Sequence, residues 1–225
     1  MMKPIPYTAV IWDWNGTLLN DARACCAIMN DVLRRHRAPP LSYARYQDIF
    51  DFPVQRYYEM LGFDFRRTPF EQVGTEFITR YERRRSRLRL QPGARSLLDA
   101  LQRHGVTQVV LSAYRQETLE TLIAEKRLRQ VFHHLSGANN HYAEGKIEQG
   151  VRLIKELELD PSVTLMVGDT RHDWEVARAM GVDCVLLDAG HQSRQRLVAC
   201  GVPLFDDLPA FGRWLFSGGS PCADA

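Results

Sequence analysis

This sequence has few lysines and no long apolar run. Only four of its 29 basic residues are lysines, at Lys3, Lys126, Lys146 and Lys155. The apolar segment near the N-terminus, residues 5–12, is too short for a signal peptide or a membrane-spanning helix. We therefore expect a cytoplasmic protein with no membrane partner.

Cysteine and net charge exclude further classes of protein. The cysteines form no CxxC pair and no metal-ligand spacing, and an odd number of them does not indicate a disulfide framework. Reduced thiols are typical of the cytoplasm. The formal net charge of +2 is too small to indicate a nucleic-acid partner. We expect a monomer or weak homodimer. The cysteines are Cys25, Cys26, Cys184, Cys200 and Cys222.

Along the sequence, apolar runs of strand length alternate with amphipathic stretches of helix length. Runs rich in Val, Ile and Leu, without polar alternation, are typical of parallel strands buried on both faces. Repeated βα units predict an α/β fold with a Rossmann-like, doubly wound parallel sheet. The expected strands are residues 8–12, 108–112, 131–136, 164–168 and 182–187. The expected helices are residues 93–104, 116–126, 146–158 and 174–180.

About 95 residues without a strand-like run separate the first two predicted strands. Helices are expected there over residues 22–37 and 54–61. A third should open at Thr68-Pro69 and present an apolar stripe that includes Tyr81 and Leu88. A helical insert of this length predicts an all-helical cap domain.

The predicted domains follow from this insert. Residues 1–18 and 91–216 form the catalytic core, and residues 19–90 form the cap. The small, polar residues 217–225 form a disordered tail.

The first chemical motif is Asp13-Trp14-Asn15-Gly16-Thr17-Leu18, directly after the first strand. The carboxyl ends of parallel strands form the ligand crevice of such a sheet, so Asp13 is expected to point into it. Gly16 lets the backbone approach a ligand closely, and successive N–H groups of the turn can hold an oxyanion. An Asx turn followed by a helix cap is the alternative interpretation.

A second motif, Gly168-Asp169-Thr170-Arg171-His172-Asp173, follows another strand. Its two carboxylates are expected to converge with Asp13 at the sheet edge. Magnesium binds few carboxylates together with water and substrate phosphate oxygens, so Asp13, Asp169 and Asp173 predict a Mg²⁺ site. Helix capping by Asp169 or Asp173 is the structural alternative.

Two lesser positions complete a phosphate site. Ser112 ends the second strand and can donate a hydroxyl to a phosphate oxygen. Lys146 begins the helix before the fourth strand and can neutralise the same phosphate as a point charge. Either residue alone is better explained by a turn or a solvated helix start.

The order of these four motifs resembles that of the haloacid dehalogenase superfamily, and the helical insert resembles the C1 class of caps in that superfamily. Within it, the sequence most resembles the phosphoglycolate phosphatase-like members. The resemblance runs from about Ile5 to Leu215. It implies a magnesium-dependent phosphatase for a small phosphorylated molecule, with a phosphoglycolate-like substrate as one candidate.

The resemblance also assigns roles to residues. Asp13 would form an aspartyl-phosphate. Magnesium would be held by Asp13, the main-chain carbonyl of Asn15, Asp169 and Asp173. Phosphate oxygens would be bound by Ser112, Lys146 and the segment Trp14, Gly16 and Thr17.

Asn15 departs from the family pattern, which has Asp two residues after the nucleophile as general acid and base. An amide has no proton to exchange near neutral pH, and loss of such a group costs about 10²–10⁴-fold in rate. Three explanations remain open. The leaving group needs little protonation, the acid comes from elsewhere, with His172 and His191 as candidates, or the protein is a weakened binder of phosphate ligands.

Two related chemistries are disfavoured. Phosphonoacetaldehyde hydrolase, whose motif also lacks the second Asp, needs a cap lysine, and none lies between Asp13 and Pro92. The dehalogenases need no metal, whereas this chain keeps the metal-type motif.

Arginines are concentrated at the end of the predicted cap, between residues 80 and 89. A solvated helix face is the simplest interpretation, and no interleaved aromatic series indicates nucleic acid. Arg84 falls on the predicted inner stripe, and Arg56 lies beside two tyrosines, so both are candidates for substrate binding.

Overall fold

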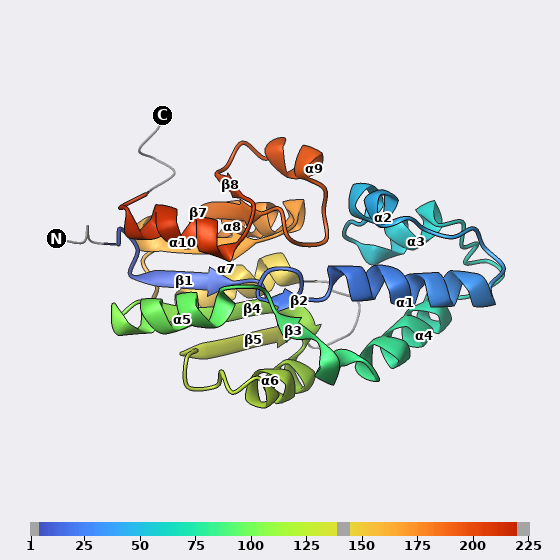
Figure 1. The fold of residues 1–225 in the computed structure, drawn as a ribbon, viewed down its shortest axis with the longest axis horizontal. Helices are drawn as coiled ribbons and strands as arrows, with labels where there is room; N and C mark the ends of the chain where they lie inside the picture. The colour runs from blue at the N-terminus through green and yellow to red at the C-terminus, as the bar shows by residue number, and fades with distance from the viewer. Residues whose placement is uncertain (1–4, 139–144, 220–225) are drawn as a thin grey trace.

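The computed structural model describes residues 5–138 and 145–219 of the chain. An α/β core carries the two motifs, and a helical cap lies beyond the ends of its strands (Figure 1). This arrangement confirms the predicted fold class. Of the predicted tail, Ser217–Gly219 follow the last helix, and residues 220–225 lie outside the described part. None of the described helices is long and apolar enough to cross a membrane.

The core is built on a six-stranded, all-parallel sheet with the order β5-β4-β1-β6-β7-β8. β1 therefore lies in the middle, between β4 and β6, and brings its carboxyl end to the centre of the sheet edge. The strands are β1 (Ala9–Trp12), β4 (Thr107–Arg115), β5 (His134–Ala138), β6 (Thr164–Gly168), β7 (Asp183–Leu187) and β8 (Leu204–Phe205).

Two predicted strands differ from the observed ones. β4 continues three residues past Ser112, with a register shift against β5 between Leu111 and Arg115. β5 begins at His134, because the N–H of Val131 is bonded to the carbonyl of Leu128 in a turn. Buried apolar residues before β5 therefore belong to the turn.

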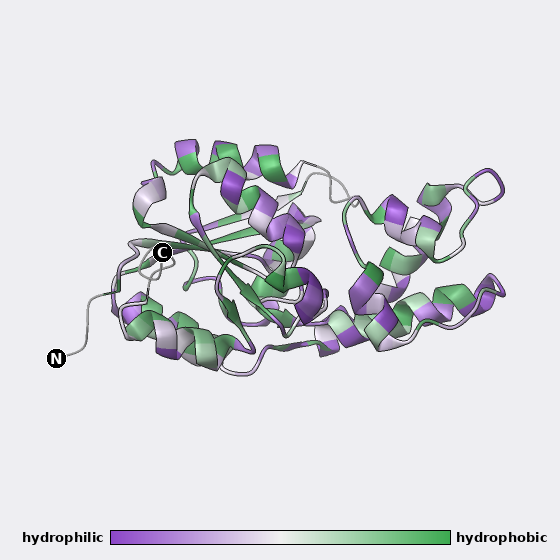
Figure 2. Cartoon of the chain, turned by 90° about the horizontal axis from the view of Figure 1, so that it is seen from above, coloured by the Kyte–Doolittle hydropathy of each residue, from purple (hydrophilic) through white to green (hydrophobic). Residues whose placement is uncertain are grey.

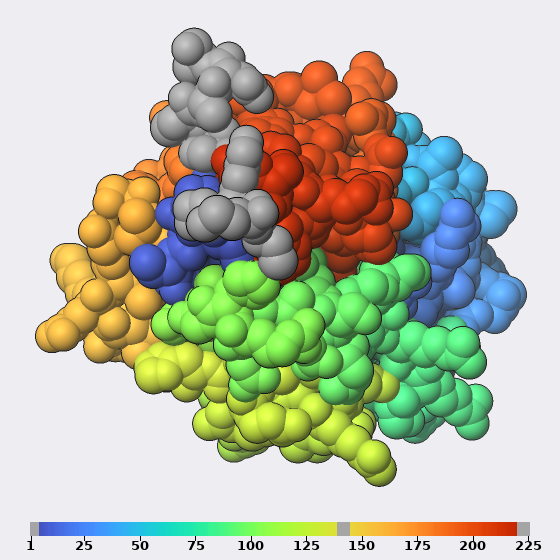
Figure 3. Space-filling view, turned by 60° about the vertical axis from the view of Figure 1, so that its left-hand side comes forward, coloured from blue at the N-terminus to red at the C-terminus, as the bar shows by residue number. Residues whose placement is uncertain are grey.

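Helices cover both faces of the sheet, whose strands are mostly hydrophobic (Figure 2). Successive strand residues point to opposite faces, so Val10 and Trp12 enter one apolar cluster and Ile11 the other. One face is covered by α5 (Ala94–Arg103), α6 (Gln116–Glu125) and α10 (Leu208–Phe216), whose green, yellow-green and red surfaces lie next to one another in Figure 3. The other is covered by α7 (Lys146–Glu156), α8 (Arg171–Met180) and α9 (Arg194–Val198). A 3₁₀ turn, η2 (Pro161–Val163), precedes β6.

The cap consists of α1 (Ala22–Arg35), α2 (Tyr43–Ile49), α3 (Val54–Met60) and α4 (Phe70–Glu82). α1 and α4 pack side by side (Figure 1). α2 was not expected, although Ser42 is its N-cap and accepts a hydrogen bond from the N–H of Arg45.

The predicted stripe on the last cap helix is wrong beyond Glu82. The chain leaves α4 there through tight turns, with Arg84 N–H bonded to Tyr81 and Leu88 N–H to Arg85, around η1 (Arg85–Arg87). Arg84 and Leu88 therefore do not continue its inner face.

The two connections between core and cap run antiparallel, as β2 (Leu19–Asn20) and β3 (Arg89–Leu90). The predicted boundaries of the cap fall in this short ribbon. One apolar cluster nevertheless contains residues of both parts, such as Trp12 of β1 and Ile28 of α1. A separately folding cap stays a prediction.

Candidate active site

Three carboxylates meet at the carboxyl edge of the sheet. Asp13 directly follows β1, and its N–H is bonded to Val167 of β6. Asp169 follows β6, and Asp173 lies in the first turn of α8. Oxygen atoms of the three side chains lie within 4.8 Å of one another, and all three are buried. The structure thus brings together the three acids that the two motifs predicted.

Lys146 lies among these acids. Its Nζ is 2.6 Å from Oδ1 of Asp13 and 2.6 Å from Oδ1 of Asp173, and its side chain is 4% exposed. The lysine is the first residue of α7, so the amino end of this helix lies at the same edge of the sheet as Asp13. A buried cation so placed balances part of the negative charge that the three acids concentrate.

Burial and mutual repulsion control the ionisation of the acids. Burial, with the charges of Asp173 and Asp169, raises the pKa of Asp13 to about 8 despite Lys146. Burial and Asp173 likewise raise the pKa of Asp169 to about 6. For Asp173, burial is outweighed by Lys146 and Thr170, which hold its pKa below the ordinary value. Asp173 is therefore the ionised partner of Lys146, and the other two retain protons more readily than free aspartates.

Asp169 and Asp173 are held by the local structure of the motif. Thr170 is the N-cap of α8, and Asp173 completes a capping box by accepting from Thr170 N–H at 3.0 Å and from its hydroxyl at 2.7 Å. Asp169 accepts from the hydroxyl of Thr17 at 2.9 Å and from the N–H of His191 at 2.6 Å. Asp173 thus completes the capping box with one oxygen and faces Lys146 with the other, whereas the N-cap itself is Thr170 and neither of the two acids.

The donor set suits a hard cation. Asp13, Asp169 and Asp173 offer buried oxygen atoms, the ligands that Mg²⁺ prefers. Burial, with repulsion between the acids, raises the pKa values of Asp13 and Asp169, and a bound cation would offset both effects. The residues present therefore fit a divalent cation.

The residues predicted to bind phosphate fall into two groups. Ser112 is buried at the end of the central run of β4 and lines the cavity together with Lys146. Trp14, Gly16 and Thr17 do not line it. The Trp14 ring is fully buried in the apolar core, Gly16 N–H donates to Asp21 Oδ1 at 2.8 Å, and Thr17 supports Asp169.

The tight closure of residues 14–19 explains this placement. The N–H groups of Leu18 and Leu19 both donate to the carbonyl of Trp14, which turns the segment back on itself. Gly16 has a φ of 83°, and a Cβ there would lie 2.3 Å from Oδ2 of Asp169. The glycine thus allows the turn to pack directly against an acid of the site.

Both N–H groups of the Asn15 amide are engaged within the protein. Its amide nitrogen donates to Asp21 Oδ2 at 2.7 Å and to the hydroxyl of Tyr81 at 2.8 Å, and that hydroxyl donates to Asp21 at 2.7 Å. Asp21 thereby fixes the orientation of the amide. Asn15 also lines the cavity, with both N–H groups of its amide already bonded.

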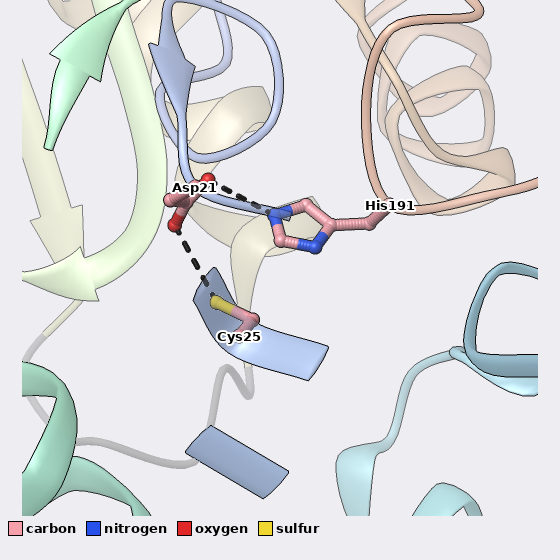
Figure 4. A group of neighbouring side chains, drawn as sticks. All are labelled: Asp21, Cys25 and His191. Carbon is pink, nitrogen blue, oxygen red and sulfur yellow. Dashed lines mark hydrogen bonds and ion pairs between the residues drawn. The ribbon is translucent and has the colours of Figure 1, made fainter. Parts of the chain in front are cut away.

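Asp21 also pairs with His191, as Figure 4 shows together with Cys25. His191 Nε2 lies 3.3 Å from Asp21 Oδ1, and His191 Nδ1 lies 2.6 Å from the hydroxyl of Tyr46. Burial disfavours charge on His191, but Asp21 outweighs it and raises the histidine pKa to about 9. Burial opposes ionisation of Asp21 as well, and His191 holds the pKa of that acid below the usual value. The pair is a buried ion pair.

Asp21 was missed by reasoning from the sequence. It occupies the N-cap position of α1, where an aspartate is commonplace, yet its side chain makes no capping hydrogen bond. Asp21, Cys25 and His191 lie close enough to share a metal. The Asp21 carboxylate already accepts from Gly16, Asn15 and Tyr81, which argues for the ion pair and against a second metal.

The acids open into a cavity of about 150 Å³ between core and cap. The predicted substrate arginines do not line it: Arg56 is exposed on α3, and Arg84 pairs with Asp31 at 2.7 Å. Of the two histidines considered as an acid, His191 lines the cavity and His172 does not. Seven aromatic residues of the cap line the cavity and are termed the aromatic wall: Tyr46, Phe50, Phe52, Tyr57, Tyr58, Phe77 and Tyr81.

Comparison with known proteins agrees with this architecture. The family described as haloacid dehalogenase-like hydrolase matches residues 10–187. A phosphoglycolate phosphatase of Synechococcus elongatus is 24% identical over 195 residues, which cover 85% of this chain and 88% of that protein. An N-acetylmuramic acid 6-phosphate phosphatase of Pseudomonas aeruginosa is 25% identical over 198 residues, 84% of this chain and 85% of that one.

Solved structures show the same fold. A haloacid dehalogenase-like family hydrolase from Streptococcus pneumoniae superposes with a TM-score of 0.80 at 14% identity, covering 93% of this chain and 99% of that one. The protein tyrosine kinase A of Mycobacterium tuberculosis superposes with a TM-score of 0.78 at 22% identity, covering 93% and 98%.

Proposed function

Because this chain belongs to the haloacid dehalogenase-like hydrolase family, we propose that it is a magnesium-dependent phosphatase that hydrolyses a small phosphate ester through an aspartyl-phosphate on Asp13. The observation that carries this proposal is the convergence of Asp13, Asp169, Asp173 and Lys146 on one cavity beneath the cap. Relatives named as phosphoglycolate and N-acetylmuramic acid 6-phosphate phosphatases make phosphoglycolate-like esters the first compounds to test.

In the proposed reaction, a carboxylate oxygen of Asp13 attacks phosphorus, and the leaving oxygen takes the electron pair of the breaking P–O bond. Lys146 lies beside the attacking oxygen and offsets charge on the phosphoryl group. Ser112 offers a hydroxyl at the same place. Water then attacks the aspartyl-phosphate, which regenerates Asp13 and releases inorganic phosphate.

Asp13, Asp169, Asp173 and the main-chain carbonyl of Asn15 would hold the magnesium ion. When bound, the ion supplies Lewis-acid stabilisation of the phosphoryl oxygens. The chain's own residues keep the acids in place, since Thr17 holds Asp169 and Thr170 holds Asp173.

We expect Asp13→Asn to lower phosphate release by about 10⁴-fold or more, as for loss of a covalent nucleophile, with the fold intact. The measurement is steady-state phosphate release with Mg²⁺ over a panel of phosphorylated metabolites, with circular dichroism of each variant. Asp48→Asn, the same change at an exposed residue of α2, is the matched control and should retain activity. Undiminished activity in excess chelator would contradict the proposal.

A phosphate-ligand binding protein with weak or no turnover is the alternative, and the amide at Asn15 favours it. The same panel separates the two functions. If the wild-type protein binds phosphate esters in calorimetry but releases no phosphate with Mg²⁺ from any of them, binding is the function.

A further inference from the structure

The cavity beside the acids is chemically unlike a site for a small, acidic phosphate ester. We propose that its substrate is a small aryl phosphate, whose ring lies against the aromatic wall while its phosphate meets Asp13 and Lys146. This inference rests on the proposed phosphatase function and names the substrate class of the same site.

Shape and lining of the cavity support a ring. Its volume of about 150 Å³ is that of a protein cavity known to hold benzene. Phe77 and Tyr81 of the wall are stacked with centroids 6.2 Å apart, and Tyr81 meets Tyr114 of β4 edge to face at 5.9 Å. Aromatic groups pair favourably in both geometries, so these rings offer faces and edges to an aromatic ligand.

The charges around the cavity disfavour a leaving group that carries a carboxylate. Among the described residues that line it, the cations are Lys146, paired with Asp13 and Asp173, and His191, paired with Asp21. No arginine is found among these lining residues. The carboxylate of a phosphoglycolate-like ester would find no unpaired cation there, and a buried charge without a partner is costly.

The two lining side chains considered for the role of general acid, Asn15 and His191, are unsuited to it. Asn15 cannot act as an acid, and both ring nitrogens of His191 have partners, Asp21 and Tyr46. An ester cleaved without a general acid must expel its leaving group as an anion. A phenol, with a pKa near 10, leaves as an anion far more readily than an alkyl alcohol.

The proposed step balances without an added reagent. The P–O bond to the ring breaks, its electron pair stays on the aryl oxygen, and the phenolate takes a proton from solvent after release. Water hydrolyses the aspartyl-phosphate, so one aryl phosphate and one water give one phenol and one inorganic phosphate.

An orphaned hydroxyl independently indicates a ligand in this cavity. The Tyr57 side chain lines it and is 2% exposed as a residue, yet its hydroxyl has no hydrogen-bond partner among the described residues. Burying a hydroxyl without a partner is unfavourable, and a polar ring substituent of the substrate would supply the missing partner.

The test compares four esters on the full-length, Mg²⁺-loaded protein: phenyl phosphate, cyclohexyl phosphate of matched size, 2-phosphoglycolate and acetyl phosphate. Acetyl phosphate needs no proton and is too small to fill the cavity, so it reports on the phosphatase function alone. We expect kcat/KM for phenyl phosphate to exceed those for cyclohexyl phosphate and 2-phosphoglycolate by about 100-fold, the contribution of an absent acid.

A wall variant tests ring recognition. Phe77→Ala should lower kcat/KM for phenyl phosphate by about tenfold and reduce the ratio of phenyl to acetyl phosphate turnover. Met60→Ala, an exposed cap residue that does not line the cavity, is the matched control and should leave that ratio unchanged.

The outcomes separate the two proposals. Turnover of acetyl phosphate with 2-phosphoglycolate equal to or better than phenyl phosphate overturns the aryl proposal and leaves the phosphatase function standing. No turnover of any ester overturns the phosphatase function itself. A phosphotyrosyl peptide cleaved faster than phenyl phosphate would also overturn the assignment to a small molecule.

Discussion

Asn15 is held by hydrogen bonds that a carboxylate could not make. Its NH₂ group donates to both Asp21 and Tyr81. An aspartate in its place would put a second carboxylate about where the amide nitrogen lies, 2.7 Å from Asp21. Like charges at such a distance raise the pKa of one group and cost stability. The Asn15 amide and the Asp21 carboxylate are therefore complementary as hydrogen-bond donor and acceptor.

This pairing changes the effect expected of a substitution at Asn15. From the sequence alone, Asn15→Asp should gain activity on alkyl phosphates by restoring an acid. With Asp21 present, we expect the single variant to lose about 1–3 kcal/mol of unfolding free energy and to gain no activity. The swap Asn15→Asp with Asp21→Asn restores the hydrogen bond and should raise kcat on alkyl phosphates about tenfold.

Urea denaturation and steady-state kinetics of both variants check this prediction. The double variant carries the same new carboxylate without the repulsion, and Asp21→Asn alone is the matched control for loss of the Asp21–His191 ion pair. A single variant that is as stable as the wild type and more active would contradict it.

Protonation of the metal-site acids predicts a pH-dependent response to magnesium. The pKa values of Asp13 and Asp169, about 8 and about 6, lie above the ordinary 3.8, so the folded, metal-free protein binds these protons more tightly than the unfolded chain. The contribution of these two acids to the stability of the metal-free protein is therefore largest at acid pH and falls as the pH rises towards 8. Magnesium must displace the same protons, so its binding tightens as pH rises.

We expect Mg²⁺ affinity to rise on the order of 100-fold between pH 6 and pH 8, about tenfold per pH unit for the proton on Asp13. The thermal stabilisation given by Mg²⁺ should be correspondingly larger at pH 8. Titration calorimetry and thermal unfolding at both pH values measure these effects. Equal affinity at the two pH values would show that the acids are already ionised.

Docking of α2 on the core closes the cap over the cavity. Gln47 of α2 accepts from Ser193 N–H at 3.1 Å and donates to the Gly190 carbonyl at 3.1 Å. Arg196 of α9 reaches the Phe50 carbonyl and pairs with Asp51 at 2.6 Å. These contacts lie on the side of the cap away from the β2–β3 ribbon (Figure 1), so the ribbon is placed to act as a hinge.

We expect Arg196→Ala to loosen this closure. A partly exposed ion pair contributes up to about 1 kcal/mol, so KM should rise up to about fivefold while kcat is not lowered. Arg194→Ala is the matched control, because Arg194 pairs with Asp188 and Asp206 of the core at 3.1 and 2.7 Å. The same KM in both variants, measured under identical conditions, would show that the pair does not hold the cap.

Core and cap share one apolar cluster, which indicates cooperative unfolding of the whole molecule. The cluster joins residues of the sheet, such as Val110, to cap residues such as Tyr46 and Val73. Unfolding the cap alone would therefore expose apolar surface of both parts to water. The cluster argues for one folding unit despite the insert.

We expect a single denaturant transition with coincident midpoints by two probes. All four tryptophans lie outside residues 19–90, so their fluorescence reports on the core, whereas far-UV circular dichroism includes the cap helices. A dichroism change that precedes the fluorescence change would show a separately unfolding cap.

The sequence by itself determined the sheet and the acids at its edge. Apolar runs such as Thr164–Gly168 are local patterns, and strand ends of a parallel sheet meet at one edge whatever lies between them. The second motif likewise placed Asp169 and Asp173 where a strand ends and a helix starts, although α8 begins at Arg171 and not at Trp174. These features depend on neighbours in sequence and on the general geometry of the fold.

Only the tertiary structure decided what surrounds the reacting group. The partners of Asn15 and Asp21 come from α4 and from a loop 170 residues away, at Tyr81 and His191. Trp14 entered the core, and Arg84 turned to Asp31, because the turns beside them pack against distant segments of the chain. Such contacts depend on the packing of distant segments, which periodicity and spacing do not encode.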